Sequence, residues 1–223
     1  KSDVMADIIS YNQNQSIFNI KSDYYNYNFE VELNYPGKHN IYNSLAATTI
    51  ALEIGINAKT ISQALKKYSG VKRRFELIYH NKNNNIIFVD DYAHHPIEVK
   101  YTLDAAKSGW KNRIISIFEP HLYSRTKDFF REFANALSIS DKIIITDIYG
   151  AREKPLKGIT SKLIIEELKS NDFNDVLYIK DKNNIPLKLI DLINKNDMII
   201  CMGAGQINSI IDRSLDLIKD KYE

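Results

Sequence analysis

From about residue 75 onward, strand-like runs of apolar residues alternate with amphipathic stretches. The runs are FELIYH, IIFVDD, RIISIFE, DKIIITDIY, DVLYI and DMIICMG, and the amphipathic stretches lie near 97–108, 126–138, 160–170, 185–195 and 205–219. Regular alternation of strands and helices is typical of βαβ units, which build a mostly parallel sheet. Several runs are nearly continuous in Ile, Val and Phe, as expected for strands buried on both faces. The sequence therefore predicts an α/β fold for this part of the chain.

The first 70 residues follow a different pattern. Residues 1–35 contain short apolar–polar alternations, such as SIFNI and YNFEVEL, separated by turns rich in Asn and Asp, which predicts antiparallel strands. Two helices are then expected, at 39–54 and at about 59–68. The apolar residues of the first helix recur on one side, at Leu45, Ala46, Ile50 and Ile54. The change of pattern places a domain boundary near residues 70–75.

Charge and composition exclude some classes of function. The chain has 30 Lys and Arg against 28 Asp and Glu, without long like-charge runs, whereas a nucleic-acid-binding protein would cluster its basic residues. We find no apolar run of membrane length and no signal-peptide pattern. The single cysteine, Cys201, rules out an intrachain disulfide and suits a reducing compartment. The composition thus predicts a cytoplasmic protein that binds neither nucleic acid nor a membrane.

Polar side chains gather where the expected strands end. They are, in chain order, Asp90, Asp91, Tyr92, His94, His95, His121, Tyr123, Ser124, Arg125, Asp147, Tyr149, Arg152 and Glu153. The last run ends in a Gly-Ala-Gly turn, which can bring backbone N–H groups to an anion. Because ligands of a parallel sheet sit at the carboxyl ends of its strands, these residues predict a ligand site at that edge.

Each of these features also has a purely structural interpretation. His95 could cap a helix, an Asp after a buried strand is often a helix N-cap, the Gly-Ala-Gly turn could only pack closely, and Arg73 and Arg74 could be solvated linker charges. A zinc site is disfavoured, because His94 and His95 are adjacent in an extended segment and point to opposite sides. No Cys-x-x-Cys, His-Glu-x-x-His or Gly-x-Ser-x-Gly motif is present. We therefore expect no metal ligands among these residues.

Six segments together resemble the Mur ligases. They are GKHNIYNSLAA, GVKRRFE, DDYAHHP, FEPHLYSRT, DIYGAREKPLKGITS and MGAGQI, and they fall in the order and approximate spacing of that family. The resemblance covers essentially the whole chain and is strongest to the members that add L-alanine. It implies that residues 1–72 are the C-terminal part of the central ATP-binding domain. Residues 73–223 would be the C-terminal, Rossmann-like domain that binds the amino acid.

The resemblance implies an enzyme that forms an amide bond in peptidoglycan synthesis. Such ligases activate the carboxylate of UDP-N-acetylmuramate with ATP as an acyl phosphate, which the amine of L-alanine then attacks. The protein mainly positions the reactants and neutralises phosphate charge. The implied nucleotide-binding residues are His39, Asn40, Asn43, Arg74 and Asp91. Arg74 would reach the terminal phosphate, and Asp91 would accept hydrogen bonds from the ribose hydroxyls.

The resemblance also implies an amino-acid pocket lined by Tyr92, His94, His121 and Arg125. The expected catalytic residues are Arg74 and His94. Arg125 suits the substrate carboxylate, because a guanidinium can hold it with two parallel hydrogen bonds. His94 would face the pocket and His95 would support the loop. Many relatives carry Arg where this chain has Leu122, so one carboxylate contact is expected to be missing or replaced.

A second departure concerns the phosphates. No Gly-x-x-x-x-Gly-Lys-[Ser/Thr] motif occurs, and the only Gly-Lys, Gly37-Lys38, is followed by His39. The chain also begins without methionine, inside sequence that reads as structured. We therefore expect the phosphate loop, the Mg²⁺ ligands and the UDP-sugar domain to precede Lys1, and the chain alone to be inactive. The alternatives are the recycling ligase that attaches a whole tripeptide to the same UDP-sugar, and a non-catalytic module that binds nucleotide or amino acid.

Overall fold

The computed structural model describes residues 3–222. The chain divides into two compact units, one formed by residues 1–71 and 104–111 and the other by residues 72–103 and 112–223. One sheet of three strands and one of six account for the strands of these residues. Both units combine a sheet with helices, so the α/β class expected from the sequence is confirmed.

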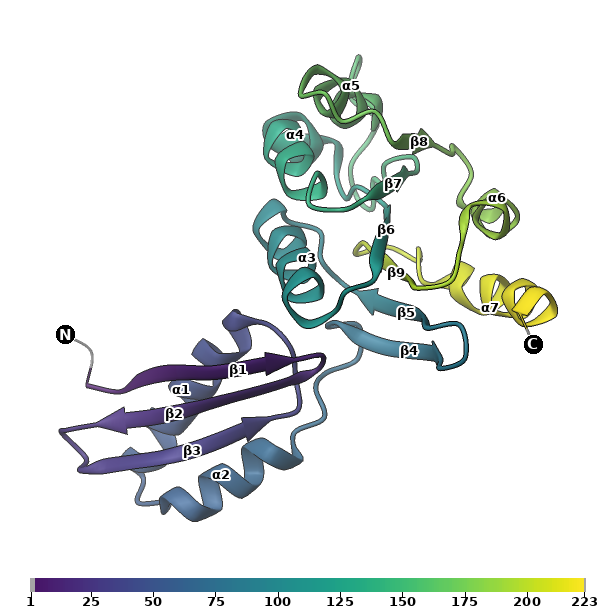
Figure 1. Ribbon diagram of the computed structural model, residues 1–223. Coiled ribbons are helices and arrows are strands. Elements are labelled where there is room, and N and C mark those ends of the chain that lie inside the picture. Colours follow the sequence, from purple (N-terminus) through teal and green to yellow (C-terminus); the bar gives the residue numbers. More distant parts are fainter. Residues whose placement is uncertain (1–2, 223) are drawn as a thin grey trace. The chain divides into compact units, whose positions relative to one another are not determined.

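The first unit contains a three-stranded antiparallel sheet and two helices. The strands are β1 (Met5–Asn12), β2 (Gln15–Ser22) and β3 (Tyr27–Leu33), in the order β1-β2-β3, and the helices are α1 (Lys38–Glu53) and α2 (Ala58–Lys67). Figure 1 shows α1 behind the sheet and α2 beside β3. Alternate residues of β2 and β3 form the core with α1 and α2, among them Phe18, Ile20, Val31 and Leu33. The antiparallel strands and both helices agree with the sequence prediction.

The buried side of α1 is not the apolar row that the sequence indicated. The buried residues of α1 are Asn40, Ile41, Ser44, Thr48 and Leu52. Ile50 and Ile54, in contrast, are 65% and 71% exposed. The Ser44 hydroxyl donates to the Asn40 carbonyl within the helix at 2.8 Å, so this small polar side chain is buried without an unmet hydrogen bond.

The second unit is built on a six-stranded sheet in the order β4-β5-β9-β6-β7-β8. The strands are β4 (Glu76–Asn81), β5 (Ile86–Asp91), β6 (Arg113–Phe118), β7 (Lys142–Ile145), β8 (Val176–Tyr178) and β9 (Asp197–Met202). Only β4 runs antiparallel to its neighbour, and all other pairs are parallel. Every residue of β5 and β9 is buried. The mostly parallel sheet with strands buried on both faces is therefore confirmed.

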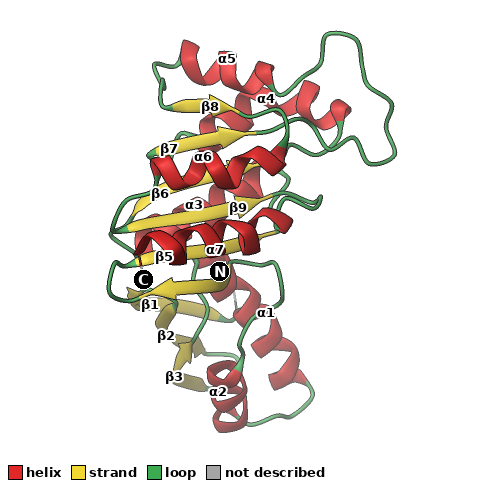
Figure 2. Ribbon diagram, turned by 90° about the vertical axis from the view of Figure 1, so that its right-hand side faces the viewer, coloured by secondary structure: helices red, strands yellow, loops and turns green. Residues whose placement is uncertain are grey.

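Helices cover both faces of this sheet. In Figure 2, α6 (Ile185–Leu192) and α7 (Ser209–Tyr222) lie in front of the strands, and α3 (Pro96–Gly109), α4 (Tyr123–Leu137) and α5 (Lys162–Ser170) lie behind. A short 3₁₀-helix, η1 (Lys182–Asn184), precedes α6. Because β5, β6, β7 and β9 run in one direction, the loops that follow them open at one edge of the sheet.

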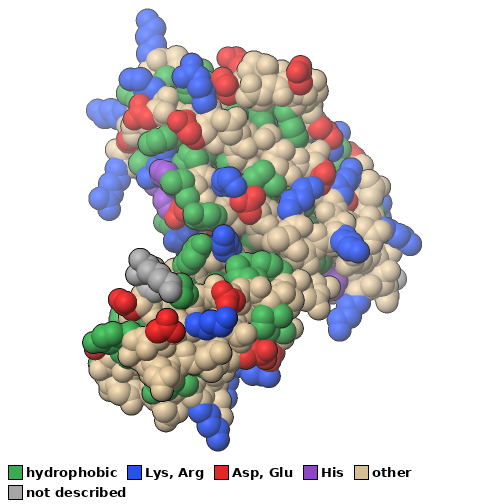
Figure 3. Space-filling model, turned by 60° about the vertical axis from the view of Figure 1, so that its left-hand side comes forward, with side chains coloured by type: hydrophobic (Ala, Val, Ile, Leu, Met, Phe, Trp, Pro, Cys, Tyr) green, Lys and Arg blue, Asp and Glu red, His purple; other side chains and the backbone are tan. Residues whose placement is uncertain are grey.

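The surface mixes both signs of charge. On the face drawn in Figure 3, Lys and Arg side chains are interspersed with Asp and Glu. Among residues 3–222, no helix combines the length and the apolar character that crossing a bilayer requires.

Candidate functional site

The loop between β5 and α3 carries the first group of site residues. Nδ1 of His94 lies 2.8 Å from the carbonyl oxygen of Tyr92. Since a carbonyl oxygen can only accept, Nδ1 carries the proton and Nε2 is the basic nitrogen of neutral His94. The Tyr92 and His94 rings meet edge to face at 5.0 Å. The backbone of the loop thus fixes both the tautomer and the orientation of His94.

Glu98, in the first turn of α3, holds both histidines of this loop. Its Oε2 accepts hydrogen bonds from the backbone N–H groups of His94 at 3.0 Å and of His95 at 3.1 Å. Burial raises the pKa of Glu98, but these hydrogen bonds and the neighbouring His94 outweigh burial and hold the pKa below its usual value. Sequence analysis missed Glu98. Its position three residues after His95, at the start of a helix, is the capping signal that could have indicated it.

The segment after β6 carries His121 in the loop and Arg125 in the first turn of α4. Nη1 of Arg125 lies 2.9 Å from Nδ1 of His121 and 3.5 Å from the carbonyl oxygen of His94. A guanidinium can only donate, so Nδ1 of His121 accepts and the proton of its neutral ring is on Nε2. Burial lowers the pKa of His121, and the Arg125 charge and His94 lower it further, which favours this neutral form.

Both contacts of Arg125 use the same nitrogen. Within residues 3–222, Nε and Nη2 of Arg125 make no hydrogen bond. This edge of the guanidinium presents two parallel donors, which is the geometry that matches a carboxylate. Within the same residues, no ion pair joins Arg125 to Asp128, so the guanidinium is not used for local pairing on α4.

The two loops meet although their strands are not neighbours. β9 lies between β5 and β6, yet the rings of His94 and His121 approach edge to face at 5.4 Å. The structure thus brings together the four residues that the resemblance placed in the amino-acid pocket, Tyr92, His94, His121 and Arg125. The His95 ring instead contacts Phe129, at 5.3 Å between centroids.

The loop after β7 supports this group from its other side. The Tyr149 ring stacks on His121 at 5.8 Å, and backbone hydrogen bonds join Tyr149 to Pro120 and Leu122. Glu153 accepts from the hydroxyl of Ser124 and from its backbone N–H at 2.9 Å, and these bonds hold the pKa of Glu153 below its usual value. From the sequence, Tyr149 and Glu153 were identified only as polar residues after a strand.

The carboxylate of Asp91 is fixed by hydrogen bonds from other residues of the second unit. One carboxylate oxygen accepts from the backbone N–H of Ala93 at 2.7 Å, and the other accepts from Phe75 N–H at 2.8 Å and from the Thr102 hydroxyl at 3.0 Å. Burial raises the pKa of Asp91, although these hydrogen bonds partly offset it. A carboxylate can accept about four hydrogen bonds, so one position remains for a further donor.

Arg73 joins the linker to the last strand. Its Nη2 donates to the carbonyl oxygens of Gly203 at 2.7 Å and of Gly205 at 3.1 Å, and its Nε lies 3.3 Å from Oδ2 of the buried Asp90. Burial raises the pKa of Asp90, whereas Arg73 lowers it. The interpretation of Arg73 as a solvated linker charge is therefore wrong.

Arg74 makes weaker contacts. Its Nη1 lies 3.3 Å from Glu98 Oε1, and its side chain is 46% exposed. The guanidinium groups of Arg73 and Arg74 lie 5.0 and 5.6 Å from the centroid of the Tyr92 ring, within cation–π distance. Of the two arginines, Arg74 is thus the one that a phosphate in solvent could reach.

The Gly-Ala-Gly turn packs against the end of β6. A Cβ atom at Gly203 would lie 3.0 Å from the Glu119 carbonyl oxygen, and one at Gly205 would lie 2.1 Å from Glu119 Oε2. Oε1 of Glu119 pairs with Lys182 Nζ at 2.9 Å. The turn directs two carbonyl oxygens to Arg73, so its observed contacts favour the close-packing interpretation.

In the first unit, the nucleotide candidates lie at the start of α1. Nδ2 of the buried Asn40 donates to the Pro36 carbonyl at 2.6 Å and lies 3.0 Å from His39 Nε2. Oδ1 of Asn40 accepts from Asn43 Nδ2 at 3.3 Å. Asn43 is exposed, and an exposed amide can both donate to and accept from an adenine edge. Residues 3–222 contain no group of three or more His, Cys, Asp or Glu side chains that could hold a metal ion.

Residues 73–205, more than half of the chain, match the family domain described as "Mur ligase, glutamate ligase domain". The chain belongs to the Mur ligase family. A UDP-N-acetylmuramate–L-alanine ligase from Desulforamulus reducens is 44% identical to this Mur ligase chain over 177 residues, which are 79% of this chain and 38% of the relative.

Two solved structures of Mur ligases resemble this chain at equal sequence identity. The UDP-N-acetylmuramate–alanine ligase of Thermotoga maritima is 26% identical with a TM-score of 0.83, and covers 99% of this chain and 47% of that one. A murein peptide ligase from Psychrobacter arcticus is also 26% identical, with a TM-score of 0.67, and covers 98% of this chain and 44% of that one. This Mur ligase chain therefore spans less than half the length of these relatives.

Proposed function

We propose that this chain is the adenine- and amino-acid-binding part of an ATP-dependent ligase that joins L-alanine to UDP-N-acetylmuramate in peptidoglycan synthesis. The observation that carries the proposal is Arg125, whose Nη1 contacts His121 and His94 while its Nε and Nη2 make no hydrogen bond within residues 3–222. Membership of the Mur ligases and the similarity to alanine ligases support it. The use of ATP and a UDP-sugar would place the reaction in the cytoplasm.

In this proposal the amino-acid pocket binds L-alanine through its carboxylate and positions its neutral amine for attack. Arg125 holds the carboxylate with two parallel hydrogen bonds, and Tyr92 and His121 shape the pocket around it. The amine attacks the acyl phosphate of UDP-N-acetylmuramate, phosphate leaves, and Nε2 of His94 accepts the proton that the amine releases. The Tyr92 carbonyl oxygen keeps His94 in the tautomer that this step needs.

The nucleotide-binding residues would be those that the resemblance implies. We assign the adenine to Asn43 with His39 and Asn40 beside it, the ribose to Asp91, and the terminal phosphate to Arg74. Arg74 would leave Glu98 to do so, a change that costs little because an exposed ion pair contributes only about 0–1 kcal/mol. Residues 1–72 would belong to the ATP-binding domain and residues 73–223 to the amino-acid domain. Mg²⁺ would be held by residues outside this chain.

The recycling ligase that attaches a tripeptide is the competing assignment. The alanine ligase and the murein peptide ligase are equally identical to this chain in sequence, but the backbone superposes better on the alanine ligase, with TM-scores of 0.83 and 0.67. Assaying the full-length enzyme with L-alanine and with a tripeptide separates the two, and preference for the tripeptide would refute our assignment.

Arg125→Lys in the full-length enzyme tests the pocket. An ammonium cannot form the two-pronged bond, so we expect kcat/KM for L-alanine to fall by an amount equivalent to about 2–5 kcal/mol, mainly through KM. KM for ATP should change little. Arg131→Lys, at an arginine of α4 that is 69% exposed, is the matched control. Unaltered alanine kinetics in Arg125→Lys would remove this residue from the site.

A further inference from the structure

Four aromatic side chains form a series across the loops that follow β5, β6 and β7. In order they are Tyr92, His94, His121 and Tyr149, and the distances between neighbouring ring centroids are 5.0, 5.4 and 5.8 Å. The first two contacts are edge to face, and the last is stacked, with 23° between the ring planes. The proposed function uses the first three residues and leaves Tyr149 without a role.

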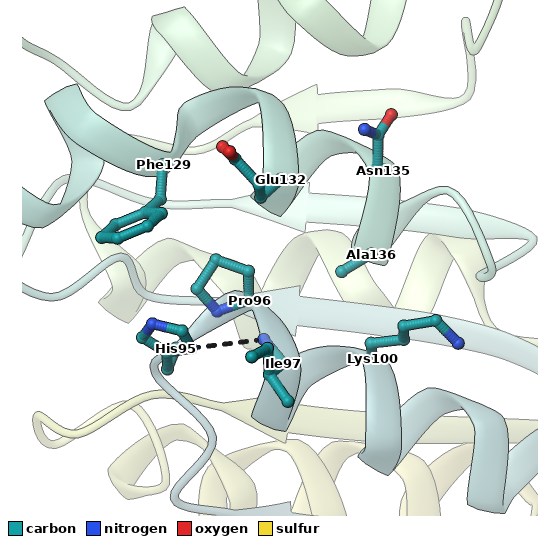
Figure 4. A pocket seen from close by; sticks show the side chains of 8 residues that line it. All are labelled: His95, Pro96, Ile97, Lys100, Phe129, Glu132, Asn135 and Ala136. Carbon is teal, nitrogen blue, oxygen red and sulfur yellow. Dashed lines mark hydrogen bonds between the residues drawn. The ribbon is translucent and has the colours of Figure 1, made fainter.

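His95 does not belong to this series, although it is adjacent to His94. Its Nδ1 accepts from the backbone N–H of Ile97 at 3.4 Å, and its ring contacts Phe129 at one end of a hollow between α3 and α4 (Figure 4). His95 thus supports the start of α3, whereas Tyr149 directly contacts a residue of the proposed amino-acid pocket.

The backbone of Tyr149 is fixed on both sides of His121. The Tyr149 N–H donates to the Pro120 carbonyl oxygen at 2.8 Å, and the Tyr149 carbonyl oxygen accepts from the Leu122 N–H at 3.0 Å. These two bonds form a parallel bridge between Tyr149 and His121. Because the bonds belong to the main chain, a substitution at Tyr149 removes the ring and leaves the bridge in place.

The turn at Gly205 packs against the Tyr149 ring. A Cβ atom at Gly205 would lie 2.9 Å from Cγ of Tyr149 and 2.1 Å from Oε2 of Glu119. Both distances are too short for a real Cβ atom, so glycine leaves the space that the ring and the carboxylate occupy. Glu119 is buried and pairs with Lys182 at 2.9 Å. The Tyr149 ring therefore contacts His121 and also a turn that is itself held in place.

The ring of His121 must keep one orientation to hold Arg125. Its Nδ1 is the atom that contacts Nη1 of Arg125, at 2.9 Å. Rotation of the ring out of its plane would turn Nδ1 away from the guanidinium. A stacked ring opposes that rotation, because the flat contact between the two rings would be lost.

We propose that Tyr149 is a positioning residue of the amino-acid pocket, whose ring holds His121 in the orientation in which Nδ1 accepts from Arg125. The proposal rests on the assignment of Arg125 to the substrate carboxylate. Tyr149 acts through His121, so its ring and not its hydroxyl is the group that matters.

Tyr149→Leu and Tyr149→Phe in the full-length enzyme separate the ring from the hydroxyl. Tyr149→Leu removes the stacked ring, so we expect KM for L-alanine to rise about three- to ten-fold, with kcat and KM for ATP within about two-fold. Tyr149→Phe keeps the ring and should hold KM for L-alanine within about two-fold of that of the unsubstituted enzyme. Tyr101→Leu, at a tyrosine of α3 that is 47% exposed, is the matched control.

The 223-residue chain tests the orientation of His121 without any assumption about the substrate. At about pH 8 the imidazole is neutral, and its ¹⁵N chemical shifts show which nitrogen carries the proton. We expect the proton on Nε2 in the unsubstituted chain and in Tyr149→Phe, because Nδ1 accepts from Arg125. Tyr149→Leu should populate both tautomers. A single tautomer with the proton on Nε2 in Tyr149→Leu overturns the proposal.

Arg125→Lys separates failure of this proposal from failure of the proposed function. If Arg125→Lys impairs the kinetics with L-alanine and Tyr149→Leu does not, Tyr149 does not position the pocket and the proposal is wrong. If Arg125→Lys has no effect while the His121 tautomer still depends on Tyr149, the assignment of the pocket is wrong and the positioning of His121 stands. An equal rise of KM in Tyr149→Phe and Tyr149→Leu would show that the hydroxyl acts, which also overturns the proposal.

Discussion

At the residue scale, the two adjacent arginines of the linker have different roles. Arg73 donates to the carbonyl oxygens of Gly203 and Gly205 and faces the buried carboxylate of Asp90. Arg73 thus gives these polar groups a partner inside the protein. Arg74 has one longer contact to Glu98 and is nearly half exposed. The two residues are adjacent and of the same type, so the sequence alone does not distinguish their roles. The difference arises because the turn at Gly203 and Gly205 packs against Arg73.

We expect Arg73→Ala to lower the free energy of unfolding by about 2–4 kcal/mol, because Asp90 would be left buried without a cation. Arg74→Ala should lower it by less than about 1 kcal/mol. Urea titration of the chain followed by circular dichroism measures both. In the full-length enzyme, Arg74→Ala should reduce kcat more than it raises KM for ATP. An equal loss of stability in the two variants would contradict the different roles.

His121 makes stability depend on pH in a defined direction. Burial and the neighbouring charges lower its pKa from 6.5, so the unfolded chain binds more protons than the folded chain between the two pKa values. The contribution is fully present above pH 6.5 and is lost as pH falls through the folded-state pKa. The free energy of unfolding should therefore decrease as the pH falls below 6.5, and His121→Gln should reduce that decrease.

His80→Gln, at a histidine of β4 outside the site, is the control for this pH dependence. In the full-length enzyme, KM for L-alanine should rise over the same pH range, because protonated His121 can no longer accept from Arg125. If His121→Gln leaves the pH dependence of the free energy of unfolding unchanged, protonation of His121 is not linked to stability.

The site residues at strand ends could be predicted from the sequence, whereas the residues that contact and orient them could not. Tyr92 and His94 come just after β5, and Arg125 lies on the segment that follows β6, so their common edge follows from the parallel sheet. Glu98 was not identified, and Tyr149 was identified only as one of the polar residues at a strand end, because their contacts depend on how a loop and a helix turn pack against another loop. Polar character alone does not specify that packing.

At the element scale, the sequence predicts the strands and helices of the second unit better than their spatial order. Long Ile-rich runs indicated β5, β6 and β9, but nothing in them indicated that β9 lies between the other two. In α1 the apolar row was visible and the buried side was still different, since Ser44 and Thr48 are small enough to pack closely. The spacing of hydrophobic residues indicates whether a segment is a helix or a strand, but the element that packs against it decides which of its faces is buried.

The first turn of α4 depends on a residue outside the helix. Leu122, its N-cap, provides no side-chain hydrogen bond, and Glu153 binds Ser124 instead. We expect Glu153→Gln to leave the fold intact but to speed amide hydrogen exchange at residues 124–128, because a carboxylate at a helix N-terminus is lost. Glu166→Gln, on the exposed side of α5, is the control, and equal exchange in both variants would show that Glu153 does not hold this turn.

At the scale of the whole molecule, the chain contains two units whose functions we propose to be complementary. Adenine recognition is assigned to the first unit, and the phosphate-facing arginine and the amino-acid pocket to the second. No phosphate-loop motif occurs in either, and the relatives named above are more than twice as long. Activity is therefore expected from the full-length protein.

The 223-residue chain, incubated with ATP, UDP-N-acetylmuramate and L-alanine, should release no phosphate above background. The positioned donors that neutralise phosphate charge supply most of the rate enhancement in phosphoryl transfer, and the chain lacks the loop that provides them. The full-length protein under the same conditions is the positive control. Turnover by the chain, free of full-length contaminant, would contradict this expectation.

The position of β9 has a consequence for how the chain folds during synthesis. Its residues leave the ribosome after β5, β6, β7 and β8, yet it fills the centre of the sheet. Until it inserts, β5 and β6 expose unpaired edges to the cell, which is the state in which nascent sheets aggregate or recruit chaperones. A ribosome that stalls before residue 197 therefore yields a sheet divided in two, with His94 and Arg125 on separate halves.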